Sequence, residues 1–192
     1  SVAAGAPLLD VASTFPAAAV PGPVPPAEAT GQYSGFFLYE RQLRGGGVLS
    51  FGEVRDRAQF FLDGAPVGTL GREHGEGSIV LPRGGLLQVL VEDQGRVNYG
   101  PRIGEAKGLV GPALLDGTEL EEWSVRAVDL SSLDPFRGAA VELPAGSSGR
   151  GGVAGPSVSF GSFEADGPGD RYLRLDGWTK GNAFVNGFNL GR

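Results

Sequence analysis

An aromatic side chain among hydrogen-bond donors stands in a loop-like segment near the middle of the sequence. Asn98 and Tyr99 are adjacent, and Arg96, Arg102 and Lys107 lie close by along the chain. A ring covers the apolar face of a pyranose, and amides or guanidinium groups hydrogen-bond its hydroxyls. Asn98 and Tyr99 are therefore candidate sugar-binding residues. The alternative is a long loop that is held by its own hydrogen bonds.

A second aromatic candidate lies near the C-terminus. Trp178 is flanked by small and polar residues, although a Trp side chain belongs to the core more often than to a binding surface. Asn186-Gly187 is expected to form a hairpin turn, which leaves Asn189 and Arg192 as polar residues without an evident local role. Trp178, Asn189 and Arg192 form the second candidate sugar-binding set.

Paired carboxylates are the remaining route to catalysis. A retaining glycosidase needs two carboxyl groups about 5 to 5.5 Å apart, one with a raised pKa. Glu92-Asp93 and Glu121-Glu122 are adjacent in the sequence, but neighbouring side chains on a strand point to opposite faces. We predict no catalytic residue here and interpret Glu121 and Glu122 as solvated acids beside a turn.

The residue inventory excludes several classes of site. The chain has no Cys and a single His, His74, so it lacks the residues for disulfides, thiolate zinc sites or a serine-histidine triad. Asp166 and Asp170 could offer two calcium ligands, but turn formation explains them equally, so we expect no metal and no cofactor. Gly45 to Gly47 lack the Lys and helix of a phosphate-binding loop and are interpreted as a turn.

The overall charge and hydropathy argue against nucleic acid and membrane partners. Lys and Arg number 16 against 22 Asp and Glu, giving a net charge of -6, and the basic residues are scattered. A nucleic-acid-binding surface needs clustered basic residues. No apolar run reaches the roughly 18 residues of a membrane helix. We expect neither partner.

Short apolar runs separated by Gly, Pro or Asp-Gly predict an all-β protein of two packed antiparallel sheets. GFFLYER and LLQVLVE are apolar nearly throughout, as central strands are, whereas YLRLD and SVRAV alternate, as half-exposed strands do. Asp63-Gly64 and Asp116-Gly117 predict tight hairpin turns. Trp123 is assigned to the core.

Composition divides the chain into four parts. Residues 1–30 are Pro-rich and predict an extended strap or linker without a helix. We expect a first jelly-roll β-domain at 31–130 and a partial second one at 156–192. The stretch PAGSSGRGG lies in the segment between them, 131–155, which is expected to be a flexible linker.

The C-terminal segment GWTKGNAFVNGFNLGR, residues 177–192, resembles the GWxKG..xVNGxNLGR segment near the end of β-galactosidases of glycoside hydrolase family 35. VRDRAQFFLDGAPVGTL and VEDQGRVNYGPRIGEAKGLVG, at 54–70 and 91–111, resemble the first non-catalytic β-domain of that family. TGQYSGFFLYER resembles the first strand of the same domain. The resemblance covers nearly the whole chain but includes neither the family's catalytic barrel nor the aromatic-rich strands that follow the LGR motif.

The resemblance implies galactose-binding-like jelly-roll β-sandwiches that pack on the barrel of a retaining β-galactosidase. The two catalytic glutamates of the family lie on the barrel, so the chain alone is expected to be inactive. The loop at Asn98 and Tyr99 is then expected either to be held by its own hydrogen bonds or to contact the barrel, rather than to bind sugar. The alternatives are a free-standing module that binds terminal galactose, and one product of a cleaved galactosidase that works only with its barrel fragment.

The two ends of the chain suggest a fragment. There is no Met, and the sequence stops directly after a strand-like segment. An incomplete second jelly roll would leave an unpaired sheet edge at 156–192. That segment would then be partly disordered, swapped between chains, or completed by residues 1–30 or by a neighbouring molecule, so we expect self-association. A cysteine-free chain fits a bacterial cytoplasm and secretion equally, and the compartment stays open.

Overall fold

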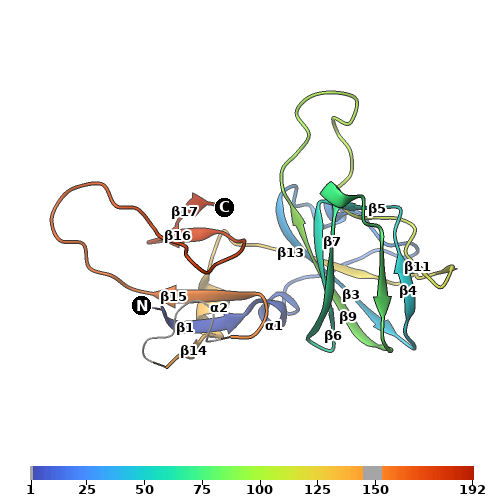
Figure 1. Ribbon diagram of the computed structural model, residues 1–192, viewed down its shortest axis with the longest axis horizontal. Coiled ribbons are helices and arrows are strands. Elements are labelled where there is room, and N and C mark those ends of the chain that lie inside the picture. The colour runs from blue at the N-terminus through green and yellow to red at the C-terminus, as the bar shows by residue number, and fades with distance from the viewer. Residues whose placement is uncertain (1, 145–152) are drawn as a thin grey trace. The chain divides into compact units, whose positions relative to one another are not determined.

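The computed structural model describes residues 2–144 and 153–192. These residues form two compact units: a central unit, Ala12–Asp129, and a terminal unit, Ser1–Val11 together with Leu130–Arg192 (Figure 1). All strand pairings in both units are antiparallel. The predicted linker sequence PAGSSGRGG lies almost entirely outside the described residues.

The central unit contains the larger number of strands. In chain order its elements are β2 (Ala18–Ala19), the 3-10 helix η1 (Ala27–Thr30), β3 (Gly35–Leu43), β4 (Gly47–Ser50), β5 (Glu53–Arg55), β6 (Arg57–Leu62), β7 (Ala65–Gly71), the 3-10 helix η2 (Arg72–His74), β8 (Ser78–Leu81), β9 (Gly85–Asp93), β10 (Gly108–Val110), β11 (Leu114–Leu115), β12 (Thr118–Glu119) and β13 (Ser124–Val128).

These strands form a β-sandwich. One sheet has the order β2-β13-β3-β9-β6-β7, a second has the order β12-β11-β4-β8, and β10 pairs with β5. The core between the sheets contains Phe37, Phe60 and Val89 from the first sheet and Leu49 and Leu81 from the second. Burial of such side chains is the main stabilising contribution, and the strand interiors supply it because alternate side chains point inward. The predicted all-β sandwich is confirmed.

The hairpin turns form where the sequence predicts them. Asp63, Asp116 and Asn186 each have a positive φ, between 48° and 50°, and each is followed by a Gly with positive φ. These turns connect β6 to β7, β11 to β12 and, in the terminal unit, two further strands. Asp and Asn tolerate the left-handed conformation that a tight hairpin requires at both central positions. The central apolar strands β3 and β9 are also confirmed.

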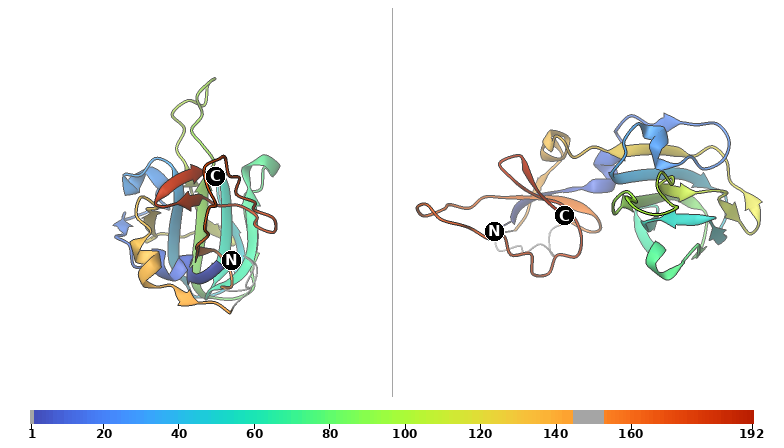
Figure 2. Two further views of the ribbon diagram at one scale, coloured as in Figure 1. Left: turned by 90° about the vertical axis from the view of Figure 1, so that its left-hand side faces the viewer. Right: turned by 90° about the horizontal axis from the view of Figure 1, so that it is seen from above.

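The terminal unit is smaller and less regular. Its elements are β1 (Val2–Pro7), α1 (Leu8–Ala12), α2 (Asp134–Gly138), β14 (Val141–Glu142), β15 (Ser157–Gly161), β16 (Ala183–Val185) and β17 (Phe188–Gly191). One sheet has the order β14-β1-β15, and among the described strands β16 pairs only with β17, the red hairpin near the C-terminus in Figure 2. The Arg137 guanidinium lies 4.6 Å from the centre of the Phe160 ring, which links α2 to β15.

Two sequence expectations differ from the structure. YLRLD, residues 172–176, is not a strand, because it has no pairing partner among the described residues and a strand forms only by hydrogen-bonding to a neighbour. Residues 1–30 do contain a short helix, α1, which lies between Pro7 and Pro16 where no proline interrupts it. The domain limits 31–130 and 156–192 stay a prediction.

The Pro-rich segment of the central unit crosses the outer face of the larger sheet. The Ser13 hydroxyl donates to Glu40 Oε1 at 2.7 Å, and the Gln88 amide donates to Ser13 Oγ at 3.2 Å. The Arg126 Nε–H donates to the carbonyl of Phe15 at 2.9 Å. These hydrogen bonds fix an otherwise irregular segment on β3, β9 and β13.

Candidate functional site at the loop between β9 and β10

The segment 94–107 joins β9 to β10 and projects from one end of the sandwich (Figure 1). Its outer part is exposed: Tyr99 is 88% exposed and Ile103 is 63% exposed. Asn98 is exposed beside Tyr99. We refer to residues 98–103 as the loop tip. The tip therefore presents one aromatic and one aliphatic side chain to the outside.

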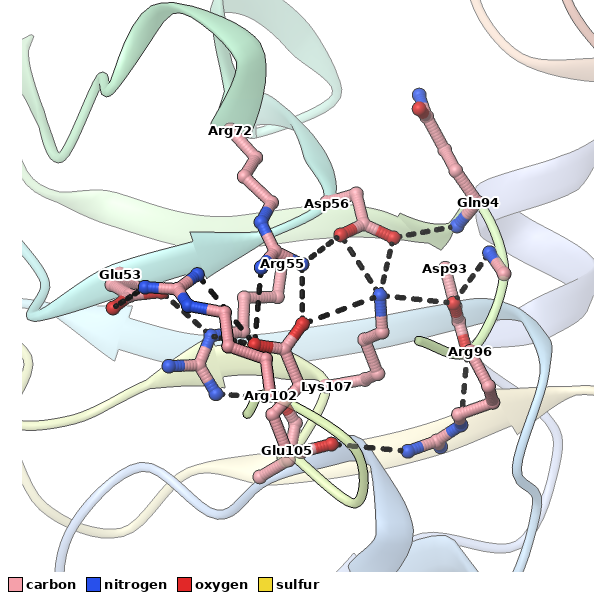
Figure 3. A network of polar contacts seen from close by, with 12 residues as sticks. Glu53, Arg55, Asp56, Arg72, Asp93, Gln94, Arg96, Arg102, Glu105 and Lys107 are labelled. Atoms are coloured by element: carbon pink, nitrogen blue, oxygen red, sulfur yellow. Dashed lines mark hydrogen bonds and ion pairs between the residues drawn. The ribbon is translucent and has the colours of Figure 1, made fainter. Parts of the chain in front are cut away.

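The base of the loop is held by a network of charged side chains (Figure 3). Lys107 is central to it and is only 1% exposed. Its Nζ donates to Asp56 Oδ1 at 2.9 Å and Oδ2 at 2.8 Å, and lies 3.6 Å from Asp93 Oδ1 and 3.9 Å from Glu105 Oε1. A buried ammonium is tolerated only when it is paired and hydrogen-bonded, as it is here.

Arg72, the first residue of η2, joins the same carboxylates from the other side. Its guanidinium binds both Glu105 oxygens, with Nη2 to Oε2 at 3.0 Å, and its Nη1 donates to Asp56 Oδ1 at 3.0 Å. These bonds raise the pKa of Arg72, and the hydrogen bond from Arg72 lowers the pKa of Glu105. A bidentate guanidinium-carboxylate contact fixes the relative orientation of the two side chains as well as their distance.

The pKa of Asp56 results from opposing effects. Burial acts to raise it, but hydrogen bonds from Lys107, the backbone N–H of Gln94 and Arg72 together hold the pKa below its ordinary value. The bond from Gln94 N to Asp56 Oδ2 is 2.8 Å long. These donors therefore favour the ionised form of Asp56 although its side chain is buried.

The first residues of the loop are held by Arg96. Its Nε donates to the carbonyl of Tyr33 at 2.8 Å and lies 3.5 Å from Asp93 Oδ2, and its Nη1 is paired with Glu28. The guanidinium carbon also lies 5.7 Å from the centre of the Tyr33 ring. Glu28 Oε1 in turn accepts from the backbone N–H of Lys107 at 2.9 Å.

An outer shell completes the network. Glu53 Oε2 accepts from Arg55 Nε at 2.7 Å, and Glu53 Oε1 lies 3.4 Å from Arg102 Nη2. The hydrogen bond from Arg55 lowers the pKa of Glu53. The network joins five acids with five bases, so its formal charges cancel: Glu28, Glu53, Asp56, Asp93 and Glu105 against Arg55, Arg72, Arg96, Arg102 and Lys107.

A shallow, open hollow of about 450 Å³ lies above this network. It is lined by Asp56, Arg72, Glu73, Lys107 and the residues from Gln94 to Val97. The Gln94 side chain points away from the network (Figure 3). The side chains of Asp56 and Lys107 are already hydrogen-bonded to one another, so they offer a polar surface rather than unpaired groups for a ligand.

The second candidate set lies in the terminal unit. Trp178 is 41% exposed, and its backbone N–H donates to the carbonyl of Leu175 at 3.0 Å. Asn189 does have a local role, because its side-chain oxygen accepts from the backbone N–H of Gly191 at 2.8 Å. Arg192 is exposed at the end of the chain. Sugar binding by Trp178, Asn189 and Arg192, and by Asn98 and Tyr99, stays a prediction.

The two pairs of adjacent acids differ in burial. Glu121 and Glu122 are exposed, and Trp123 beside them is buried in the core with its indole N–H donating to Leu120 O at 3.0 Å. Glu92 and Asp93 are both buried. Within residues 2–144 and 153–192, no three acidic or imidazole side chains come together in a way that could hold a metal ion.

The sequence did not reveal the buried network. The sequence shows a group of charges near Tyr99, namely Arg96, Arg102 and Lys107, and one interpretation of it is a loop held by its own hydrogen bonds. The partners Asp56 and Arg72 lie far away along the chain, and no local pattern relates them to Lys107. Burial of a Lys is also uncommon enough that a surface position is the default expectation.

Comparison with known families identifies both units. The model of the family "Beta-galactosidase, first all-beta domain" matches residues 26–129, which contain the sandwich and the projecting loop. The chain belongs to this β-galactosidase family. A second model, "Beta-galactosidase, galactose-binding domain", matches residues 156–192. The chain thus carries two non-catalytic β-domains of a β-galactosidase.

Curated relatives agree with this assignment. A β-galactosidase of Xanthomonas manihotis is 36% identical over 173 residues, which cover 87% of this chain and 27% of the relative. The β-galactosidase-1-like protein 2 of Homo sapiens is 35% identical over 172 residues, covering 84% of this chain and 25% of the relative. The β-galactosidase of Macaca fascicularis is 36% identical over 182 residues. The chain spans about a quarter of the length of these relatives.

No helix in the described parts of this β-galactosidase-family chain has the length and apolar character to cross a membrane. The described helices are short, with three to five residues each.

Proposed function

We propose that this chain serves a β-galactosidase as a non-catalytic support for the catalytic part, and that the loop tip of the central unit contacts that part. The observation that carries the proposal is the match to the first all-β domain of β-galactosidases over residues 26–129, which include the projecting loop. The supported activity is hydrolysis of terminal β-galactosides, performed by carboxylates outside this chain.

The form of the loop favours a protein partner over free sugar. Sugar and drug-sized sites enclose most of the ligand surface. Tyr99 stands on a projecting segment with 88% of its surface exposed, so it has no walls that could enclose a pyranose. An exposed ring beside an exposed aliphatic side chain, Ile103, is instead suited to insert into a groove of another protein surface.

Two measurements test the proposal. The purified chain is assayed with a chromogenic galactoside, and it is then mixed with the catalytic part of a galactosidase from the same source. We expect no turnover by the chain alone, and binding to the catalytic part that Tyr99→Ala weakens. Turnover by the chain alone would show that the assignment as a non-catalytic support is wrong.

A second candidate function is galactose binding by the terminal unit. It is favoured by the description of the matched family as a galactose-binding domain over residues 156–192, together with the 41% exposure of Trp178. Calorimetric titration with galactose and lactose tests it. Saturable heat that disappears in Trp178→Ala would support this function, and a flat titration would leave the supporting role alone.

A further inference from the structure

Two carboxylates of the sandwich each bind both ends of the loop 94–107. Asp56 Oδ2 accepts from the backbone N–H of Gln94 at 2.8 Å, and the Asp56 carboxylate also accepts from Lys107 Nζ at 2.9 and 2.8 Å. Glu28 is paired with Arg96 and accepts from the backbone N–H of Lys107 at 2.9 Å. The loop is therefore closed at its base by two anions that do not belong to it.

We propose that Asp56, Lys107 and Glu28 are positioning residues that clamp the two ends of the loop together and thereby hold its tip ready to contact the catalytic part. This inference rests on the proposed function for its final step. A segment of this length loses substantial conformational entropy when it docks, and fixing its ends beforehand removes part of that loss from the binding step.

The choice of charged groups for the clamp supports a role in positioning. A buried ion pair often contributes no more stability than well-packed apolar residues of similar volume, because both charges must lose their water. It does impose a geometry, since the Lys107 ammonium must reach both Asp56 oxygens while Asp93 and Glu105 lie within 4 Å. Apolar replacements would fill the space without fixing the ends of the loop.

The test compares three variants in the same chain. Asp56→Leu/Lys107→Met removes both charges and keeps apolar volume. Glu28→Gln weakens the second anchor. Because Glu28 is more exposed, this substitution disrupts the fold less and serves as the test if the first variant folds poorly. Arg83→Gln is the control, because it breaks an ion pair with Asp63 that lies on the surface of the same unit. Urea unfolding establishes that each variant is folded.

The decisive measurement is amide hydrogen exchange. We expect residues 96–106 to exchange at least tenfold faster in both clamp variants, with β3 and β9 unchanged, and no change at the loop in Arg83→Gln. Unchanged exchange at the loop in folded clamp variants would overturn the clamp.

A second readout separates the clamp from the proposed function. Affinity for the catalytic part is measured for the clamp variants with and without Tyr99→Ala. If the clamp acts through the tip, the clamp variants weaken binding about tenfold, but cause no further loss once Tyr99 is replaced. Faster exchange with unchanged affinity would support the clamp and contradict the proposed docking role of the tip. Equal losses with and without Tyr99 would overturn positioning of the tip by the clamp.

Discussion

Lys107 Nζ lies within 2.9 Å of both carboxylate oxygens of Asp56, although the two residues are 51 positions apart. Lys107 is 1% exposed and Asp56 is 6% exposed. Two further carboxylates, of Asp93 and Glu105, lie within 4 Å of the same ammonium. The pair therefore joins the strand region before β6 to the end of the projecting loop, and it does so inside the protein.

Removing one member of this pair is expected to destabilise the chain strongly. Lys107→Met leaves buried carboxylates with one cation fewer, which costs about 3–5 kcal/mol in the free energy of unfolding. Asp56→Leu/Lys107→Met removes an equal number of both charges and is expected to recover most of that loss. Urea unfolding of both variants checks this. A double variant as unstable as Lys107→Met would show that other contacts of these side chains dominate.

The network also predicts loss of stability in acid. The folded-state pKa values of Asp56 and Glu105 lie below the ordinary values of 3.8 and 4.5. Their contribution to stability is therefore complete above these ordinary values and is lost as the pH falls through the lower folded-state values. We expect the urea midpoint to fall as the pH is lowered below about 4.5, and to fall less steeply in Asp56→Leu/Lys107→Met. Parallel declines would contradict this account.

Gly108 and Gly104 offer a matched test of close packing at the end of the loop. Both have a positive φ, of 97° and 81°, so alanine is strained at each by about 1–2 kcal/mol. A Cβ at Gly108 would also overlap the buried Tyr39 hydroxyl and lie 2.9 Å from Ala27 N, whereas a Cβ at Gly104 meets nothing within 4 Å. Gly108→Ala should cost about 1–3 kcal/mol more than Gly104→Ala in chemical unfolding. Equal costs would show that the sandwich relaxes around the added methyl group.

Tyr99→Ala is expected to separate binding from stability. The ring is almost fully exposed, so its removal should change the free energy of unfolding by no more than about 0.5 kcal/mol. Affinity for the catalytic part of a galactosidase should fall about tenfold or more, as for an anchor residue. Tyr172→Ala is the control, because Tyr172 is 87% exposed in the terminal unit. Equal effects of the two substitutions on affinity would contradict a specific role for Tyr99.

Self-association through the hairpin β16–β17 stays a prediction and can be measured directly. In the described residues this hairpin pairs with no other strand, and Phe188 and Leu190 on β17 are exposed. Sedimentation velocity should show a species larger than the monomer that dissociates on dilution. Phe188→Lys/Leu190→Lys should abolish it, because charge on an edge strand opposes pairing. Val48→Lys/Val80→Lys, on exposed positions of the central unit, should not. A wild-type chain that is monomeric at all concentrations would contradict this prediction.

Most of the sandwich follows from local sequence. The strands β3 and β9 and the turns at Asp63, Asp116 and Asn186 depend on residues next to one another. Nearly continuous apolar runs predict the two strands, and the tolerance of Asp and Asn for the left-handed conformation predicts the turns. The segment YLRLD shows the limit of this reasoning. Its alternation is compatible with a strand, but a strand also needs a neighbour, and none of the described strands pairs with it.

The candidate site also has some features that the sequence predicts and others that depend on tertiary contacts. Asn98 and Tyr99 could be placed in a polar loop from composition alone, and the sequence motifs by themselves indicated β-domains of a galactosidase. The burial of Lys107, its pairing with Asp56 and the closure of both loop ends by Asp56 and Glu28 were decided only by the tertiary structure. The reason is physical: the free energy of a buried charge depends on which distant groups surround it after folding, and no sequence neighbour carries that information.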